Sequence, residues 1–161
     1  MINYSDGIMV DSIEYAFSII KSNLDLSSTI ECGPAEGVMT KKIIGLSNKL
    51  EVIEGSSDHA KILKVNFPEI TVHNKMFEDF ETNKKYSSII MSHVLEHVED
   101  PVFILKKFSK YLKENGKIFT LVPNANSIHR QAAVIMGLLN SNDQLNDRDI
   151  THGHKRVFTP S

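Results

Sequence analysis

Short apolar runs alternate with amphipathic stretches along the chain, and this alternation predicts its secondary structure. Runs rich in β-branched and aromatic residues predict buried strands. Between them, apolar residues recur every three to four positions, the spacing of a helix with one buried face. The predicted strands are 28–32, 50–54, 70–73, 86–91 and 117–122. The predicted helices are 9–23, 36–46, 57–65, one that begins at Pro101 and ends by Asn115–Gly116, and 127–140. The last twenty residues are polar, and we expect them to be irregular.

The order of these elements predicts the class of fold. Strands that alternate with helices over short loops build a parallel sheet through right-handed crossovers. A chain of 161 residues is the size of one domain. We therefore predict a single α/β domain over residues 1–161, with a mainly parallel sheet.

The turn after the first predicted strand has the composition of a ligand-binding loop. Glu31 stands near the end of that strand, and Gly33 and Gly37 follow in a turn where the lack of a Cβ lets the backbone approach a ligand closely. The second predicted strand ends in Glu54, where a carboxylate can accept hydrogen bonds from both hydroxyls of a ribose. These features predict a nucleoside-bearing cofactor at the carboxyl ends of the strands.

Charge and cysteine content exclude several other classes. Lys and Arg total 18 against 20 Asp and Glu, so no basic surface indicates a nucleic-acid partner. Cys32 is the only cysteine; it fits a reducing compartment, and we expect it to be a small packed residue of the loop. No apolar run approaches the roughly 18 residues of a membrane span, and the N-terminus lacks a signal-peptide pattern. We expect a soluble, cytoplasmic protein.

Two later motifs indicate which cofactor is bound. SHVLEHVEDP (92–101) follows the fourth predicted strand, and the fifth ends in VPN (122–124). Together with the glycine loop, they resemble the class I S-adenosylmethionine-dependent methyltransferases, above all ubiquinone-type O-methyltransferases and bacterial sugar or natural-product methyltransferases. The resemblance covers roughly residues 25–125 and continues more loosely through 127–130 and 151–160. It implies a Rossmann-like three-layer sandwich, S-adenosyl-L-methionine as the cofactor, and methyl transfer to an oxygen or nitrogen of a small molecule.

The resemblance also implies a set of cofactor-binding residues. Glu31 would be the acid of the first loop and Glu54 the ribose-binding acid, whereas Ala35 stands where the family most often has a third glycine. Gly55, Ser56, Met76 and Phe77 would lie near the adenine, and Ser92 and His93 would lie under the methionine moiety. The full set is Glu31, Gly33, Pro34, Ala35, Gly37, Glu54, Gly55, Ser56, Met76, Phe77, Ser92, His93 and Val94.

Histidines are the candidate catalytic residues, because a hydroxyl acceptor must lose its proton and imidazole titrates near neutral pH. The candidates are His97, His129 and His154; packing against the sheet is the alternative for His97, and an exposed helix start for His129 and Arg130. The pair His152 and His154 has no evident carboxylate or cysteine nearby to complete a metal site, so we expect no metal. A substrate-side loop or a solvated tail are the other readings of that pair.

The same resemblance divides the domain into an N-terminal helical or lid segment (1–24), a cofactor-binding core (25–125), and a substrate-side helix and loop (126–161). The family normally adds two more strands after the fifth, so we expect a sheet truncated there, with an open edge. The apolar run 132–139 could be core, a lid or the face of a homodimer, and Asp143, Asp147 and Asp149 should lie at the surface. The alternative functions are an inactive methyltransferase-like binding module and a nucleotide-dependent oxidoreductase, although the glycine spacing is not that of G-x-G-x-x-G.

Overall fold

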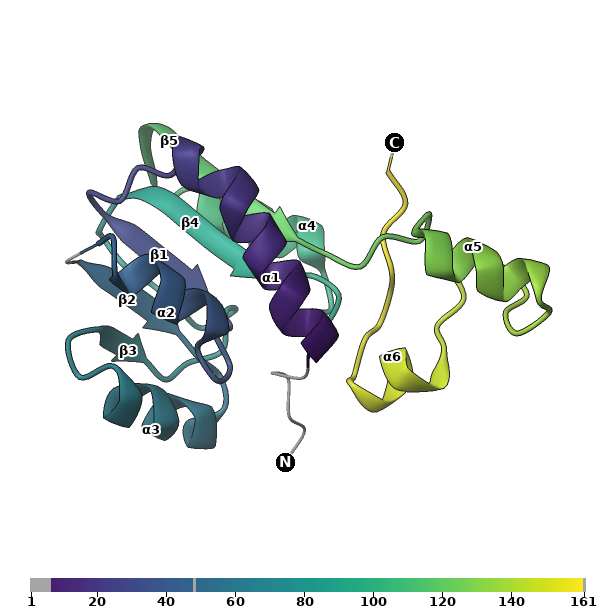
Figure 1. The fold of residues 1–161 in the computed structure, drawn as a ribbon. Coiled ribbons are helices and arrows are strands. Elements are labelled where there is room, and N and C mark those ends of the chain that lie inside the picture. Colours follow the sequence, from purple (N-terminus) through teal and green to yellow (C-terminus); the bar gives the residue numbers. More distant parts are fainter. Residues whose placement is uncertain (1–6, 48, 161) are drawn as a thin grey trace.

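Strands and helices alternate in the computed structural model, which describes residues 7–47 and 49–160 (Figure 1). Residues 1–6 of the segment 1–24, expected to be helical or a lid, lie outside the described residues. The strands are β1 (Thr29–Cys32), β2 (Leu50–Ile53), β3 (Thr71–His73), β4 (Tyr86–Ser92) and β5 (Leu112–Leu121). The helices are α1 (Gly7–Ile20), the 3-10 turn η1 (Lys21–Asn23), α2 (Val38–Ile44), α3 (Ser57–Asn66), α4 (Pro101–Ser109), α5 (Ile128–Ile135) and α6 (Asp147–Thr151). Among these, no helix has the length and apolar character needed to cross a bilayer.

The five strands form a parallel sheet in the order β3-β2-β1-β4-β5, which confirms the predicted α/β fold. β1 lies at the centre, with Cys32 opposite Ile53 of β2 on one side and Met91 of β4 on the other. The chain runs outward from β1 through β2 to β3 and then returns to the far side of β1. Open parallel sheets bind ligands at such a reversal, beyond the carboxyl ends of the strands.

Helices cover both faces of the sheet and bury two apolar cores. Side chains alternate between the faces of a strand, so neighbouring residues enter different cores. On one face α4 packs Ile104 and Phe108 against Ile30 and Ile89, among others. On the other face α1, α2 and α3 cover a second cluster, formed by Ile13, Met39, Ile43, Leu50, Val52, Leu63 and Ile90. The predicted three-layer sandwich is therefore present (Figure 1).

The connection from α4 to β5 differs from the prediction. The helix begins as expected, because the Asp100 carboxylate accepts a hydrogen bond from the Phe103 amide and Pro101 occupies the first turn. It ends at Ser109, and β5 begins at Leu112 opposite Tyr86. The pairing with β4 is interrupted between Tyr86 and Ser88, where Asn115 takes a φ of 62°. Asn115–Gly116 therefore makes a turn within the strand pairing and does not end the helix.

The segment after β5 lies beyond the carboxyl edge of the sheet (Figure 1). The expected irregular tail is wrong in one part, because residues 147–151 form α6, which begins with a capping box between Asn146 and Asp149. Asp149 is buried, contrary to the expected surface position, and Arg130 donates to it across 3.0 Å. The apolar run 132–139 divides: Leu139 is buried, whereas Ile135, Met136 and Leu138 are exposed. A homodimer through this run stays a prediction.

Candidate functional site

A pocket of about 450 Å³ opens at the carboxyl edge of the sheet, where the strand order reverses. Its walls are the loops that follow β1, β2 and β4, the segment 75–77, and the first turns of α2 and α3. The lining residues are Ile13, Glu31, Gly33, Pro34, Ala35, Glu36, Val38, Met39, Glu54, Gly55, Ser56, His59, Lys75, Met76, Phe77, Ser92, His93, Val94 and His97. Residues far apart in the sequence thus meet because parallel strands present their carboxyl ends at one edge.

The loop after β1 owes its shape to left-handed backbone. Gly33 has a φ of +64°, and its amide donates to the carbonyl of Ile53, which ties the loop to β2. A Cβ at Gly33 would lie 2.9 Å from Cγ2 of Val94, so only glycine keeps the two loops this close. Ala35 has a φ of 49°, a conformation that favours glycine and explains why the family most often has glycine there.

Glu54 joins the loops after β1 and β2. Its buried carboxylate accepts hydrogen bonds from two backbone amides, one from each loop: Ala35 at 3.1 Å and Ser56 at 2.8 Å. The backbone carbonyl of Glu54 accepts in turn from the Asn74 side chain at 2.7 Å. Each carboxylate oxygen accepts one hydrogen bond from an amide and has a second lone pair that can accept a hydrogen bond from a ligand.

Glu31 lies on the same pocket wall but in a drier environment. The side chain is 1% exposed, and the hydroxyl of Thr40 in α2 donates to it across 2.7 Å. Burial raises the pKa of Glu31 from its ordinary value of 4.5 to about 7, and the charge of Glu54 pushes it in the same direction. The two acids therefore share one crevice closely enough to interact, and a cation placed there would be attracted to both.

The loop after β4 supplies the opposite wall through Ser92, His93, Val94 and His97. His93 adopts a φ of +55°. Its Nδ1 lies 3.0 Å from Oε1 of Glu96, and Glu96 is fully buried. Ser92 Oγ is buried and has no hydrogen-bond partner among the described residues. This wall therefore adds polar side chains to the lining of the pocket.

The three candidate catalytic histidines occupy different environments. His97 lines the pocket, and His154 lies behind it, with 4.8 Å between the ring centroids. Burial lowers the pKa of His97 and of His154. His129 lies on the exposed face of α5, where its ring contacts the hydroxyl of Ser127, and it does not line the pocket. Arg130 is buried in the segment beyond the sheet, so an exposed helix start is wrong for this residue.

A comparison with known protein families assigns the chain to a family. A family model described as "Methyltransferase domain" matches residues 4–161. The chain belongs to the class I S-adenosylmethionine-dependent methyltransferases. This assignment confirms the resemblance drawn from the glycine loop and the two later motifs, and it gives no support to the oxidoreductase alternative.

Individual relatives of this methyltransferase domain match only parts of it. A ribosomal RNA small subunit methyltransferase A from Marinomonas sp. (strain MWYL1) is 45% identical over 47 residues, which are 27% of this chain and 18% of that protein. A ubiquinone biosynthesis O-methyltransferase from Pelagibacter ubique (strain HTCC1062) is 32% identical over 82 residues, 51% of this chain and 33% of that protein. The chain thus aligns with a third or less of the length of these curated relatives.

A solved structure shows the same fold. The N-methyltransferase NodS from Bradyrhizobium japonicum WM9, determined in complex with S-adenosyl-L-homocysteine, superposes with a TM-score of 0.69. The superposition covers 80% of this chain and 68% of that one at 17% sequence identity. At this identity the likeness concerns the arrangement of strands and helices.

Of the candidate catalytic histidines only His97 lines the pocket, whereas nearly all of the cofactor-binding residues named from the sequence do. Gly37 is the exception: it begins α2, and a Cβ there would meet Phe67 at 2.6 Å, so it serves helix packing. Sequence reasoning missed the lining residues Ile13, Glu36, Val38, Met39, His59 and Lys75. Two of these have a usable signal, because Val38 and His59 stand in the first turns of helices that start at the carboxyl ends of strands.

Proposed function

We propose that this domain transfers a methyl group from S-adenosyl-L-methionine to an oxygen or nitrogen of a small molecule. One observation carries the proposal. Glu31 and Glu54, from neighbouring parallel strands, line a single pocket together with a loop of left-handed backbone. Two acids in that arrangement suit a nucleoside that also bears a cationic amino-acid group.

The residues of the pocket fit the parts of this cofactor. Glu54 has one lone pair left on each oxygen, which suits the two hydroxyls of a ribose. Met76 and Phe77 line the pocket beside Gly55, and the 55% exposed thioether of Met76 offers an apolar surface to an adenine ring. Glu31 is placed to receive the ammonium group of the methionine moiety, and that cation would favour the ionised carboxylate.

Transfer is then mainly a matter of position. When bound, the cofactor supplies an electrophilic methyl: its S–C bond breaks, the electron pair stays on sulfur, and the acceptor's lone pair forms the new bond. The glycine loop and the two acids fix the donor, and the wall after β4 determines where an acceptor can lie. His97 is the histidine that we propose on the acceptor side of the pocket, with His154 packed against it; His129 is exposed, does not line the pocket and has no proposed role.

The charges of the pocket favour a small acceptor over a nucleic acid. Three carboxylates line the pocket, from Glu31, Glu36 and Glu54, against one ammonium group, from Lys75. A polyanion would be repelled at such a surface, whereas a neutral or cationic small molecule would not. The ubiquinone biosynthesis O-methyltransferase relative also supports an oxygen acceptor.

The cofactor part is tested by titrating the protein with S-adenosyl-L-homocysteine in a calorimeter. We expect binding with one site, no heat from NAD, and a loss of about 30- to 100-fold in affinity for Glu54→Gln, because the substitution removes a charged acceptor of hydrogen bonds. Glu51→Gln is the matched control: Glu51 lies in β2, just before Glu54 in the sequence, but pairs with Lys84 and His73 outside the pocket. Equal losses in the two variants, or no binding by the unaltered protein, would contradict the proposal.

Transfer itself is tested with methyl-labelled S-adenosyl-L-methionine and a panel of small phenols, amino sugars and amines. We expect label in at least one acceptor, abolished together with cofactor binding in Glu54→Gln. Binding of S-adenosyl-L-homocysteine without transfer to any of them would favour the inactive binding module.

A further inference from the structure

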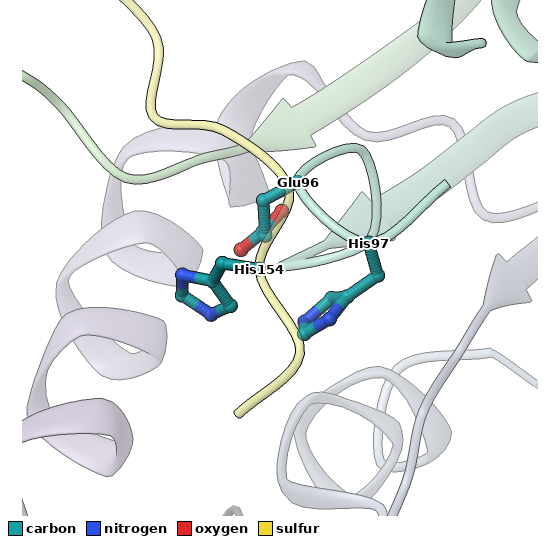
Figure 2. A group of neighbouring side chains, drawn as sticks. All are labelled: Glu96, His97 and His154. Atoms are coloured by element: carbon teal, nitrogen blue, oxygen red, sulfur yellow. The ribbon is translucent and has the colours of Figure 1, made fainter. Parts of the chain in front are cut away.

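Glu96, His97 and His154 form a cluster next to the cofactor pocket (Figure 2). One carboxylate oxygen and one nitrogen from each ring lie within 4.8 Å of one another. Glu96 and His97 follow β4, whereas His154 comes from the segment after α6, so the cluster joins positions about 57 residues apart in the sequence. In the sequence, a metal was considered only at the pair His152 and His154; the structure instead places His154 beside Glu96 and His97, and His152 is not part of the cluster.

Hydrogen bonds outside the cluster hold its two halves together. The amide of Lys155 donates to the carbonyl of Glu96 across 2.8 Å. The guanidinium of Arg156 donates to the carbonyls of Leu95, Val98 and Glu99. The strand-like residues that follow are tied to the end of β5, because the amide of Ala125 donates to Phe158 and that of Phe158 to Pro123. The juxtaposition is thus built into the fold.

Each member of the cluster has a second contact of the kind that orients a metal ligand. Nδ1 of His97 lies 3.3 Å from the carbonyl of Gly153, which can only accept, so the tautomer that makes this bond carries its lone pair on Nε2. Asp149 Oδ1 lies 3.4 Å from Nδ1 of His154, within ion-pair distance although the two atoms form no hydrogen bond, and Asp149 is itself held by Arg130. Glu96 Oε1 contacts His93. Histidine ligands in metal sites commonly donate their other ring nitrogen to a carbonyl or carboxylate in this way.

A buried, unsatisfied atom points independently to a missing ligand. Glu96 is 0% exposed, and its Oε2 has no hydrogen-bond partner among the described residues. A buried carboxylate oxygen without a partner costs free energy comparable to a lost hydrogen bond or more. A bound cation would satisfy it.

We propose that Glu96, His97 and His154 bind one divalent transition-metal ion of the zinc type. Two imidazoles and one carboxylate, with an open fourth position, are a common donor set for Zn²⁺, whereas Mg²⁺ and Ca²⁺ favour oxygen ligands alone. Ligand atoms of a tetrahedral zinc site lie about 3.4 Å apart, so small side-chain rotations would bring this cluster to that geometry. Since His97 lines the pocket, the open position would face the acceptor side; that last role rests on the proposed function, whereas metal binding does not.

The test measures metal binding directly, without an activity assay. The purified protein is stripped with a chelator and titrated with Zn²⁺ in competition with a chromophoric zinc chelator, and with Co²⁺ followed by its visible absorption bands. We expect one Zn²⁺ per chain, tetrahedral-type Co²⁺ bands, and no competition from Mg²⁺. His154→Ala should weaken Zn²⁺ binding by at least about 100-fold, more than the loss usual for a residue that only orients a ligand.

His152→Ala is the matched control, a histidine two positions away whose Nδ1 contacts the carbonyl of Arg148. It should bind Zn²⁺ like the unaltered protein. His154→Ala should still bind S-adenosyl-L-homocysteine, because His154 does not line the pocket; this separates loss of metal from loss of fold. Glu96→Gln gives a second variant with the same expected loss of Zn²⁺. The proposal is overturned if the stripped protein binds no Zn²⁺ at micromolar concentration, or if His152→Ala weakens binding as much as His154→Ala.

Discussion

The loops after β1 and after β4 lie at the same edge of the sheet, yet they are held in different ways. Each contains a non-glycine residue in the left-handed region, Ala35 in the first and His93 in the second. The first loop is fixed by its immediate neighbour in the sheet, through hydrogen bonds to Ile53 and Glu54. The second is fixed by residues 153–156, which return from beyond α6.

This difference separates the two halves of the site. The cofactor half is assembled by the sheet, so it forms wherever β1 and β2 pair. The half after β4 depends in addition on the segment 126–160, whose residues 153–156 bond to the loop after β4. Four changes would break or sharpen this contrast.

The largest effect is expected from Arg130→Ala. Arg130 is 4% exposed and donates to the carboxylate of Asp149 and to the carbonyls of Asn142 and Gln144. Removing one partner of a buried ion pair costs about 3–5 kcal/mol, here concentrated in the segment beyond β5. Hydrogen exchange should therefore accelerate strongly in residues 126–154 and little in β1 and β2, while S-adenosyl-L-homocysteine still binds.

Arg148→Ala, a change at an exposed arginine of α6, should alter stability by about 0.5 kcal/mol or less. Uniform acceleration of exchange across the sheet in Arg130→Ala would show that the two halves fold as one unit and would remove the contrast.

Glu31→Gln should change how stability depends on pH. The folded-state pKa of Glu31 is raised from 4.5 to about 7, so the fold favours the protonated acid. The unaltered protein therefore loses stability as pH rises from about 4.5 to about 7, by about 3 kcal/mol in total, and glutamine removes that loss. Urea unfolding should show that the free energy of unfolding of Glu31→Gln, relative to that of the unaltered protein, is higher at pH 8 than at pH 5.

Glu51→Gln should change the dependence of stability on pH in the opposite direction. Although burial opposes the shift, hydrogen bonds from Lys84 and His73 lower the pKa of Glu51, so its contribution is lost as pH falls. If Glu31→Gln and Glu51→Gln showed the same pH trend, the dry environment assigned to Glu31 would be wrong.

Gly33→Ala should destabilise the protein by about 1–2 kcal/mol through its φ of +64°, and further through the contact with Val94. Gly137→Ala, at a φ of +71° with open space around it, measures the backbone cost alone. The additional loss of stability in Gly33→Ala, compared with Gly137→Ala, measures how closely the loops after β1 and β4 are packed. Only Gly33→Ala should also weaken binding of S-adenosyl-L-homocysteine. An equal cost at both positions would mean that the loops are not packed together.

Ala35→Gly is expected to have the smallest effect. Relief of the left-handed strain gains about 1 kcal/mol, and the greater freedom of glycine in the unfolded chain costs a similar amount. Thermal unfolding should therefore change little, and affinity for S-adenosyl-L-homocysteine should stay within about threefold. A large loss of affinity would show that the methyl group of Ala35 contacts the cofactor.

The same contrast explains what the sequence could predict. The positions of the strands, the α/β class and the placement of Glu31 and Glu54 follow from apolar runs and from a turn whose composition is local. The Glu96–His154 contact, the burial of Arg130 and Asp149, and the start of β5 at Leu112 depend on pairings between distant segments. No periodicity in the sequence encodes those pairings. The cluster of Glu96, His97 and His154 could therefore not be predicted, although His97 and His154 were candidate catalytic residues.

The carboxylate of Glu96 lies between the pocket wall and the cluster of Glu96, His97 and His154. Its Oε1 contacts His93 on the pocket wall, Oε2 has no hydrogen-bond partner among the described residues, and the carboxylate also lies beside the two histidines of the cluster. A single rigid carboxylate thus connects two places where different partners can bind. Thermodynamic linkage then requires reciprocity: any ligand that shifts this group from one side changes affinity on the other side by the same factor.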